Sequence, residues 1–274
     1  MQKTIKPLKP IAVLLLAVCL NACDKEDDIV NATIVKEWNL TMSTKNENPA
    51  VAGRNETAAA QLQLYSDNTL HYMVTLNTAL SAGDAITAGH LHTGDPVTNG
   101  GVILDLKPVL SGNMAMGVIP IPRQSLADSI ETGSVYINFH STQVPGGLLR
   151  AQLDKTLDLV MDVPLSGANE VPAINTTATG VALLRLASDK TLFYRINVAN
   201  LEANDALTAA HIHPGAAGVN GGVLVGLISN AADFGVPKNI SLTDAAFTAI
   251  KTDPLYVNVH STNRGSGLIR GQIR

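Results

Sequence analysis

The sequence predicts an all-β protein that contains two tandem domains, each an antiparallel β-barrel or β-sandwich. The composition is the first reason, because charged residues make up only 15% of the 274 and aromatic residues 4%, unlike a helical bundle. The second reason is the pattern, since short runs that alternate apolar and polar residues are separated by turn-forming residues. The third reason is that the second half of the chain repeats the first.

Residues 1–22 are predicted to be an export signal of the bacterial lipoprotein type. The start is positively charged, and Ile11 to Leu20 form an apolar segment of 10 residues. A membrane-spanning helix needs about 20 such residues, so this segment is too short to be one. Leu20-Asn-Ala-Cys23 resembles the lipobox, in which the signal is cut before a cysteine that becomes acylated, for example with palmitate. The alternative is an ordinary secretory signal with a chance cysteine.

Cys23 is therefore the predicted lipidation site, and residues 23–34 are predicted to be an acidic tether. Two or three acyl chains hold a protein stably on a bilayer. We accordingly expect an exported protein that is lipid-anchored in the outer membrane or at the cell surface, with the membrane as a partner. The acidic run from Asp24 to Asp28 fits either a solvated spacer or a signal for surface export.

Charge and cysteine content exclude several functions. The 19 basic and 23 acidic residues give a formal net charge of −4, which argues against nucleic acid as a partner. Both cysteines, Cys19 and Cys23, lie at the leader, so the domains have no thiol for a disulfide, a nucleophile, a thiolate zinc site or an iron–sulfur cluster. Common hydrolase, metalloprotease and nucleotide-binding motifs are also absent. We therefore expect no catalytic residues and no enzymatic activity.

The repeat places the first domain at residues 35–154 and the second at residues 157–274. His90 corresponds to His211, an offset of 211 − 90 = 121, and the offset changes by only a few residues elsewhere. Each copy is long enough to bury a core of its own.

Within each copy the strands and turns can be placed in order. In the segment 135–140 the apolar residues alternate with Tyr, Asn and His, and the segment 255–260 has the same alternation, which predicts β-strands with these two sets on opposite faces. Turn-forming residues separate such runs, and a Ser or Thr precedes each short helical run. These signals predict hairpin turns at Ser66–Asn68 and Ser188–Lys190, and helices at Ser125–Glu131 and Thr243–Ile250.

Six of the seven histidines belong to the repeat. A His-x-His pair on a strand puts both rings on one face, about 6.5–7 Å apart along the backbone. If the strand that ends in the third histidine is its neighbour, three imidazoles converge, and such a set holds Zn²⁺ or Cu²⁺ with an open position. The alternative is a structural network of hydrogen bonds to loop carbonyls and to Asn138 or Asn258. The candidate metal ligands are His90, His92 and His140, and His211, His213 and His260.

The seventh histidine, His71, has Phe193 as its counterpart and is predicted to be a packing position. Other polar residues recur in both copies. The two Asn-Gly-Gly triplets predict tight turns near the histidines. For each repeated arginine we expect an ion pair with Glu47 or Glu170, and the alternative is an arginine that guides an anion to a metal. The supporting polar residues are Asn99, Asn138, Arg150, Asn220, Asn258 and Arg270.

These segments resemble the CHRD domain, the module named after chordin. The resemblance departs at Leu148 and Leu268, where the family usually has glutamate, and it covers nearly all of residues 35–274. It implies a Greek-key, immunoglobulin-like β-barrel with limited similarity to copper/zinc superoxide dismutase, in which the two histidine sets would stand for copper ligands. The matching segments are Glu170-Val-Pro172, His211-Ile-His-Pro-Gly215, Tyr256-Val-Asn-Val-His-Ser261, Gly267-Leu-Ile-Arg-Gly-Gln-Ile273 and their first-copy counterparts.

Together these observations predict a lipid-anchored envelope protein of two CHRD-like domains. We expect a non-enzymatic binding or adhesion module for an envelope or extracellular ligand, without a cofactor. The first alternative is a metal-binding or redox protein with a three-histidine copper or zinc site in each domain, which leaves a dismutase-like activity open. The second alternative is a purely structural envelope protein.

Overall fold

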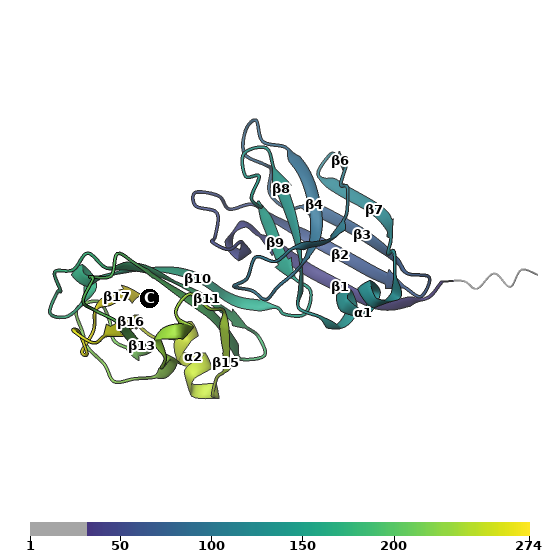
Figure 1. Cartoon of the computed structure of the whole chain (residues 1–274). Helices are drawn as coiled ribbons and strands as arrows, with labels where there is room; N and C mark the ends of the chain where they lie inside the picture. Colours follow the sequence, from purple (N-terminus) through teal and green to yellow (C-terminus); the bar gives the residue numbers. More distant parts are fainter. Residues whose placement is uncertain (1–31) are drawn as a thin grey trace, which may run out of the picture. The chain divides into compact units, whose positions relative to one another are not determined.

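The computed structural model describes residues 32–274, and within this part of the chain two antiparallel sheets make up the fold (Figure 1). One sheet is a half-barrel and the other a nearly closed barrel, which confirms the all-β prediction. The predicted signal segment, Cys23 and most of the predicted tether lie outside the described residues. None of the described helices has the length and apolar character that a membrane crossing requires.

The first sheet has the strand order β5-β4-β8-β9-β1-β2-β3-β7-β6. One short helix, α1 (Gln124–Thr132), connects β7 to β8 and buries Leu126, Ala127 and Ile130. The 3-10 turn η1 (Thr44–Asn46) follows the first strand. The strands are β1 (Ile34–Ser43), β2 (Thr57–Tyr65), β3 (Thr69–Leu76), β4 (Ile86–Thr93), β5 (Val102–Asp105), β6 (Leu110–Ser111), β7 (Met114–Pro120), β8 (Val135–Ser141) and β9 (Leu149–Gln152).

The second sheet repeats this plan in the order β14-β13-β16-β17-β10-β11-β12-β15. Helix α2 (Asp244–Thr252) corresponds to α1, and the 3-10 turns are η2 (Gly167–Asn169) and η3 (Ala231–Asp233). The strands are β10 (Leu157–Ser166), β11 (Thr179–Ala187), β12 (Thr191–Ala199), β13 (Leu207–Pro214), β14 (Val225–Ile228), β15 (Lys238–Ser241), β16 (Leu255–Ser261) and β17 (Ile269–Gln272).

The predicted turns and helices are present. Asn68, between β2 and β3, has φ 61°, and Lys190, between β11 and β12, has φ 70°, the left-handed conformation that tight hairpins use. Helix α2 begins after Thr243, whose hydroxyl accepts a hydrogen bond from the Ala246 N–H. The side chain at the start of α1, Arg123, makes no such cap.

The strands predicted at residues 135–140 and 255–260 are confirmed, and both of their faces are buried along most of their length. Val135 and Phe139 face an apolar core as expected, but Tyr136 and Asn138 on the other face are only 3% exposed. The reason is that β8 lies inside the sheet, between β4 and β9, and a loop and a buried arginine cover its polar face. A period of two therefore located this strand but did not show which face is buried.

Candidate metal centre

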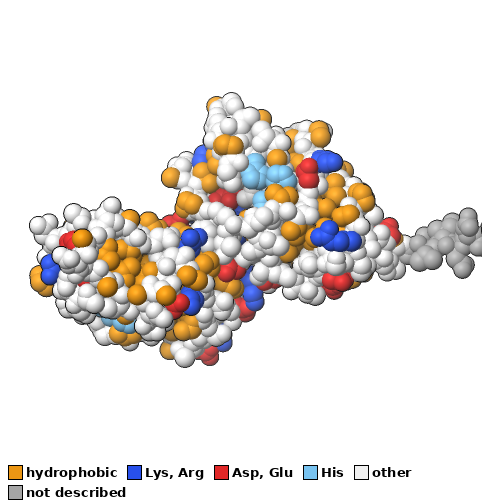
Figure 2. All heavy atoms as spheres, viewed as in Figure 1, with side chains coloured by type: hydrophobic (Ala, Val, Ile, Leu, Met, Phe, Trp, Pro, Cys, Tyr) orange, Lys and Arg blue, Asp and Glu red, His pale blue; other side chains and the backbone are white. Residues whose placement is uncertain are grey.

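Strand register brings the first three histidines together. His90 and His92 lie on β4 opposite Asn138 and Tyr136 of β8, so His140 comes two residues beyond Asn138 on the same face. One ligand atom from each of the three rings lies within 4.8 Å of the others. His92 is buried, and His90 and His140 are half-buried. Figure 2 shows histidine side chains gathered at one place over β4 and β8, and this group is exposed at the molecular surface.

Hydrogen bonds to the backbone fix which nitrogen of each ring faces the cluster. His92 Nδ1 lies 3.1 Å from the Gly100 carbonyl oxygen, and His140 Nδ1 lies 2.9 Å from that of Pro145. A carbonyl oxygen only accepts, so both rings carry the proton on Nδ1 and present the lone pair of Nε2. His90 Nδ1 lies 3.1 Å from His140 Nε2, and because that Nε2 accepts, His90 donates its Nδ1–H to it in the metal-free protein. If the His90 proton moved to Nε2, the donor set would be one Nδ1 and two Nε2 atoms.

His92 Nε2 is buried and, among the described residues, has no hydrogen-bond partner. A buried polar atom that is left unpaired costs about 1–3 kcal/mol. The purely structural network predicted as an alternative accounts for both Nδ1 contacts but leaves this nitrogen unsatisfied. The expected hydrogen bond from a histidine to Asn138 is also absent, because the Asn138 amide bonds to Glu47.

The second domain repeats the cluster. His211 Nδ1 lies 3.0 Å from His260 Nε2, and His260 Nδ1 lies 3.1 Å from the Gly265 carbonyl oxygen. His213 Nδ1 lies 3.1 Å from the carbonyl oxygens of both Gly221 and Gly222. His213 Nε2 is buried and unpaired in the part of the chain that the structure describes. The same nitrogen is therefore left open in both copies.

Burial lowers the pKa of several of these rings. Desolvation is the largest cause for His90, followed by the nearby His140, while Asp105 opposes the shift. Desolvation likewise lowers the pKa values of His92, His211 and His260. A neutral imidazole is the form that binds a metal ion.

The loop after β4 explains the first Asn-Gly-Gly triplet. A Cβ at Gly100 would lie 1.7 Å from the Thr93 carbonyl oxygen, so only glycine allows this approach. The approach places the Gly100 carbonyl on His92 and lets the Gly100 N–H donate to the Tyr136 hydroxyl. Asn99 holds the loop from outside by donating to the Asn48 carbonyl. In the second copy Gly221 bonds to Tyr256 and Asn220 to the Val171 carbonyl.

The expected ion pairs between the arginines and Glu47 or Glu170 are not formed. Arg150 donates to the carbonyl oxygens of Asp95 and Thr98 and to the Asn99 and Gln152 side chains. Its guanidinium carbon also lies 3.6 Å from the centroid of the Tyr136 ring. The prediction was wrong because backbone carbonyl oxygens of the loop accept the hydrogen bonds of the arginine, and the sequence pattern indicates only carboxylate partners. Arg270 makes the corresponding contacts with Ala216, Val219 and Asn220.

The buried carboxylates of Glu47 and Glu170 pair instead with the repeated asparagines. Asn138 Nδ2 donates to both oxygens of Glu47, at 2.8 and 3.0 Å, and Asn258 donates to Glu170 in the second copy. Desolvation raises the pKa of each glutamate to about 7, and the charge of Arg150 or Arg270 opposes the shift. A sequence signal did exist, because the Asn46–Pro49 and Asn169–Pro172 segments match in the repeat.

Three imidazole nitrogens at one partly exposed point form a suitable donor set for zinc or copper. The remaining coordination position would face the side that solvent reaches. The buried lone pairs of His92 and His213 fit such an ion without any rearrangement of the backbone hydrogen bonds, while His90 and His211 would give up the hydrogen bonds to His140 and His260.

Comparison with known proteins agrees with the repeat. The CHRD domain model matches residues 38–153 and again residues 161–273. No curated protein and no solved structure gives a significant match. Since the two matches cover most of the chain, this protein belongs to the CHRD domain family and carries two tandem copies of the domain.

Proposed function

We propose that each CHRD domain binds one zinc or copper ion through its three histidines, and that the protein is a two-site metal-binding module. The observation that supports this most strongly is the buried, unpaired Nε2 of His92 and its equivalent in His213. No protein group among the described residues uses this lone pair, and a metal ion would use it. Metal binding is therefore proposed here in place of the adhesion module that the sequence led us to expect.

Each residue of the site has a part in holding the ion. His90 Nδ1, His92 Nε2 and His140 Nε2 supply the donors, and the Gly100 and Pro145 carbonyls orient two of the rings. Such supporting contacts typically change metal affinity about 10–100-fold when they are removed. When bound, a zinc or copper ion with an open position supplies Lewis acidity or, for copper, one-electron chemistry. The proposal includes ion binding only, with no catalytic step.

The test is to observe the ring nitrogens directly. The full chain with Cys19→Ser and Cys23→Ser, so that no thiol competes, is labelled with ¹⁵N-histidine and titrated with Zn²⁺ by NMR. We expect the ¹⁵N signals of the six clustered rings to change until two equivalents of zinc have been added. In the first domain the largest changes should be at Nδ1 of His90 and Nε2 of His92. His71, which lies outside both clusters, is the internal control.

Two further variants separate binding from folding. His92→Ala should abolish zinc binding in the first domain while the His213 signals still respond. His71→Ala should leave both sites unchanged. The proposal fails if zinc produces no saturable change in the clustered rings, or if His71 responds as strongly as they do.

We also propose that the module is tethered to the cell envelope through a lipid on Cys23. The support is the lipobox resemblance of Leu20–Cys23, and these residues lie outside the part of the chain that the structure describes. A tether would keep both metal sites close to the membrane.

A further inference from the structure

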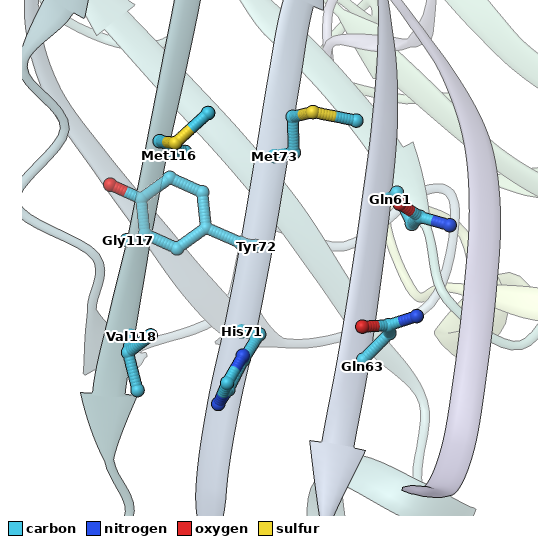
Figure 3. A pocket seen from close by; sticks show the side chains of 8 residues that line it. All are labelled: Gln61, Gln63, His71, Tyr72, Met73, Met116, Gly117 and Val118. Carbon is cyan, nitrogen blue, oxygen red and sulfur yellow. The ribbon is translucent and has the colours of Figure 1, made fainter.

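A second group of metal-binding side chains lies on the outer face of the first sheet, away from the histidine cluster. Met73 on β3 is directly opposite Met116 on β7, and His71 on β3 is opposite Val118. Met73 is 39% exposed and Met116 58%. They line a shallow hollow of about 240 Å³ together with Gln61, Gln63 and His71. Figure 3 shows the two methionines level with each other on adjacent strands, with His71 further along β3.

Methionine is unusually concentrated on this face. The chain has six methionines, of which five lie in the described residues, and three of those five are Met73, Met114 and Met116 on β3 and β7. By contrast Met42 is fully buried. Exposed positions of a strand normally carry β-branched or polar residues, so two solvent-exposed thioethers opposite each other need a reason beyond packing.

The second domain does not share these side chains. Phe193 stands at the position of His71 and Arg195 at that of Met73, at the offset of the matching Ser66 and Ser188. Lys238 occupies the register position opposite Tyr194 that Gly117 occupies opposite Tyr72. Of these, Arg195 shares the outer face with the equivalents of the methionines, and its charge would repel a cation there. The donor group is therefore a property of the first domain alone, whereas the three-histidine cluster is common to both.

The strand register lets the donors meet at one ion once the His71 side chain, whose ring points away from the two methionines in Figure 3, changes rotamer and leaves Tyr65. Side chains directly opposite on antiparallel strands have Cβ atoms about 4.5–5.5 Å apart, and diagonal neighbours about 7–8 Å. Methionine has three rotatable bonds and adapts to such distances. His71 is diagonal to Met116, its ring stacks on Tyr65 at 4.3 Å, and among the described residues neither ring nitrogen has a hydrogen-bond partner.

The chemistry selects the ion. Thioethers are soft ligands that favour Cu(I) over zinc, calcium or magnesium, and imidazole also suits copper. No residue that lines the hollow is a carboxylate, a lysine or an arginine. The nearby carboxylate of Glu37 is engaged by the amides of Gln61 and Gln63. We propose that Met73, Met116 and His71 form a Cu(I) site on the outer face of β3 and β7. This site is independent of the histidine clusters.

The experiment reads each methionine separately. The full chain with Cys19→Ser and Cys23→Ser is labelled with ¹³C-methyl methionine and titrated with Ag(I), a redox-inert substitute for Cu(I), and then anaerobically with Cu(I). The methyl signals of Met73 and Met116 should shift together as the metal ion is added. Their shifts should reach a plateau when one metal ion is bound at this site. Met42 and Met161 should not move, and Met114, which does not line the hollow, is the nearest control.

Volume-conserving variants complete the test. The double variant Met73→Leu/Met116→Leu should abolish the shift that Cu(I) causes in the NMR signals of the His71 ring. It should also remove one equivalent of bound Cu(I). Met114→Leu should change neither result. His71→Phe, the residue of the second domain, should weaken binding. Shifts that never saturate, or that affect Met114 as much as Met73, would mean adventitious binding only and would overturn the proposal. A positive result here with no zinc binding at the clusters would reject the proposed function and leave this site standing.

Discussion

The rings of His92 and Tyr136 are stacked, with centroids 4.8 Å apart and planes that differ by only 3°. The Arg150 guanidinium lies against the same tyrosine ring, so a buried cation and a candidate metal ligand share one aromatic side chain. His213, Tyr256 and Arg270 repeat the arrangement, with a stacking distance of 5.0 Å. The arginine, through its loop contacts and this ring, therefore supports the position of the histidine.

Replacing the buried arginine should destabilise the first domain. In Arg150→Lys, several loop carbonyls lose their donor, and each unpaired buried group costs about 1–3 kcal/mol. We expect the free energy of unfolding to fall by at least about 3 kcal/mol in denaturant titrations. Arg123→Lys, at an exposed position before α1, is the matched control. Equal stability of the two variants would contradict this role for Arg150.

A methyl group at Gly147 should disrupt the pair formed by Asn138 and Glu47. Gly147 has φ 135°, and a Cβ there would lie 2.7 Å from Asn138 Nδ2 and 2.9 Å from a Glu47 oxygen. Gly147→Ala should therefore lower the free energy of unfolding by about 1–3 kcal/mol, which is seen as a lower midpoint of thermal unfolding. The adjacent Gly146→Ala, whose Cβ would meet no atom within 4 Å, should have little effect. If both variants melt together, the close approach has no energetic importance.

Stability should fall as the pH rises from about 4.5 to about 7. Burial raises the pKa of Glu47 from 4.5 to about 7, so in this range the folded state binds a proton that the unfolded state has lost. The folded form is then favoured at low pH, and the advantage disappears as the pH passes the folded-state pKa. Its size is on the order of 3 kcal/mol per glutamate.

Glu47→Gln should flatten this dependence for the first domain, as measured by urea unfolding at several pH values. Glu37→Gln, at an exposed position of β1, should preserve it. An unchanged slope in Glu47→Gln would show that the carboxylate is ionised throughout this range. Glu170 should contribute a similar slope from the second domain.

The features that depend on local sequence patterns could be predicted, whereas contacts between residues far apart in the sequence could not. The repeat and the period of two located β4, β8 and their counterparts, and the His-x-His spacing identified the six clustered histidines. The partner of Glu47 was not predictable, because Asn138 is 91 residues away and the two meet only in the folded sheet. The Met73–Met116 pair likewise depends on the β3–β7 register, which no local pattern reveals.

The lipid anchor can be tested without the fold. Cells that express the full chain should incorporate labelled palmitate into the protein, and Cys23→Ser should abolish the label, since this residue is the predicted acylation site. Cys19→Ser, four residues earlier in the apolar segment, should retain it. Labelling that survives Cys23→Ser would refute the lipobox interpretation.

The most direct test of the three-histidine sites is to count tightly bound zinc by elemental analysis. The full chain with Cys19→Ser and Cys23→Ser should retain two zinc ions after dialysis. His92→Ala and His213→Ala should each retain one, and the double variant none, with circular dichroism confirming that all remain folded. Two ions in the double variant, or none in the parent protein, would contradict the metal-binding function.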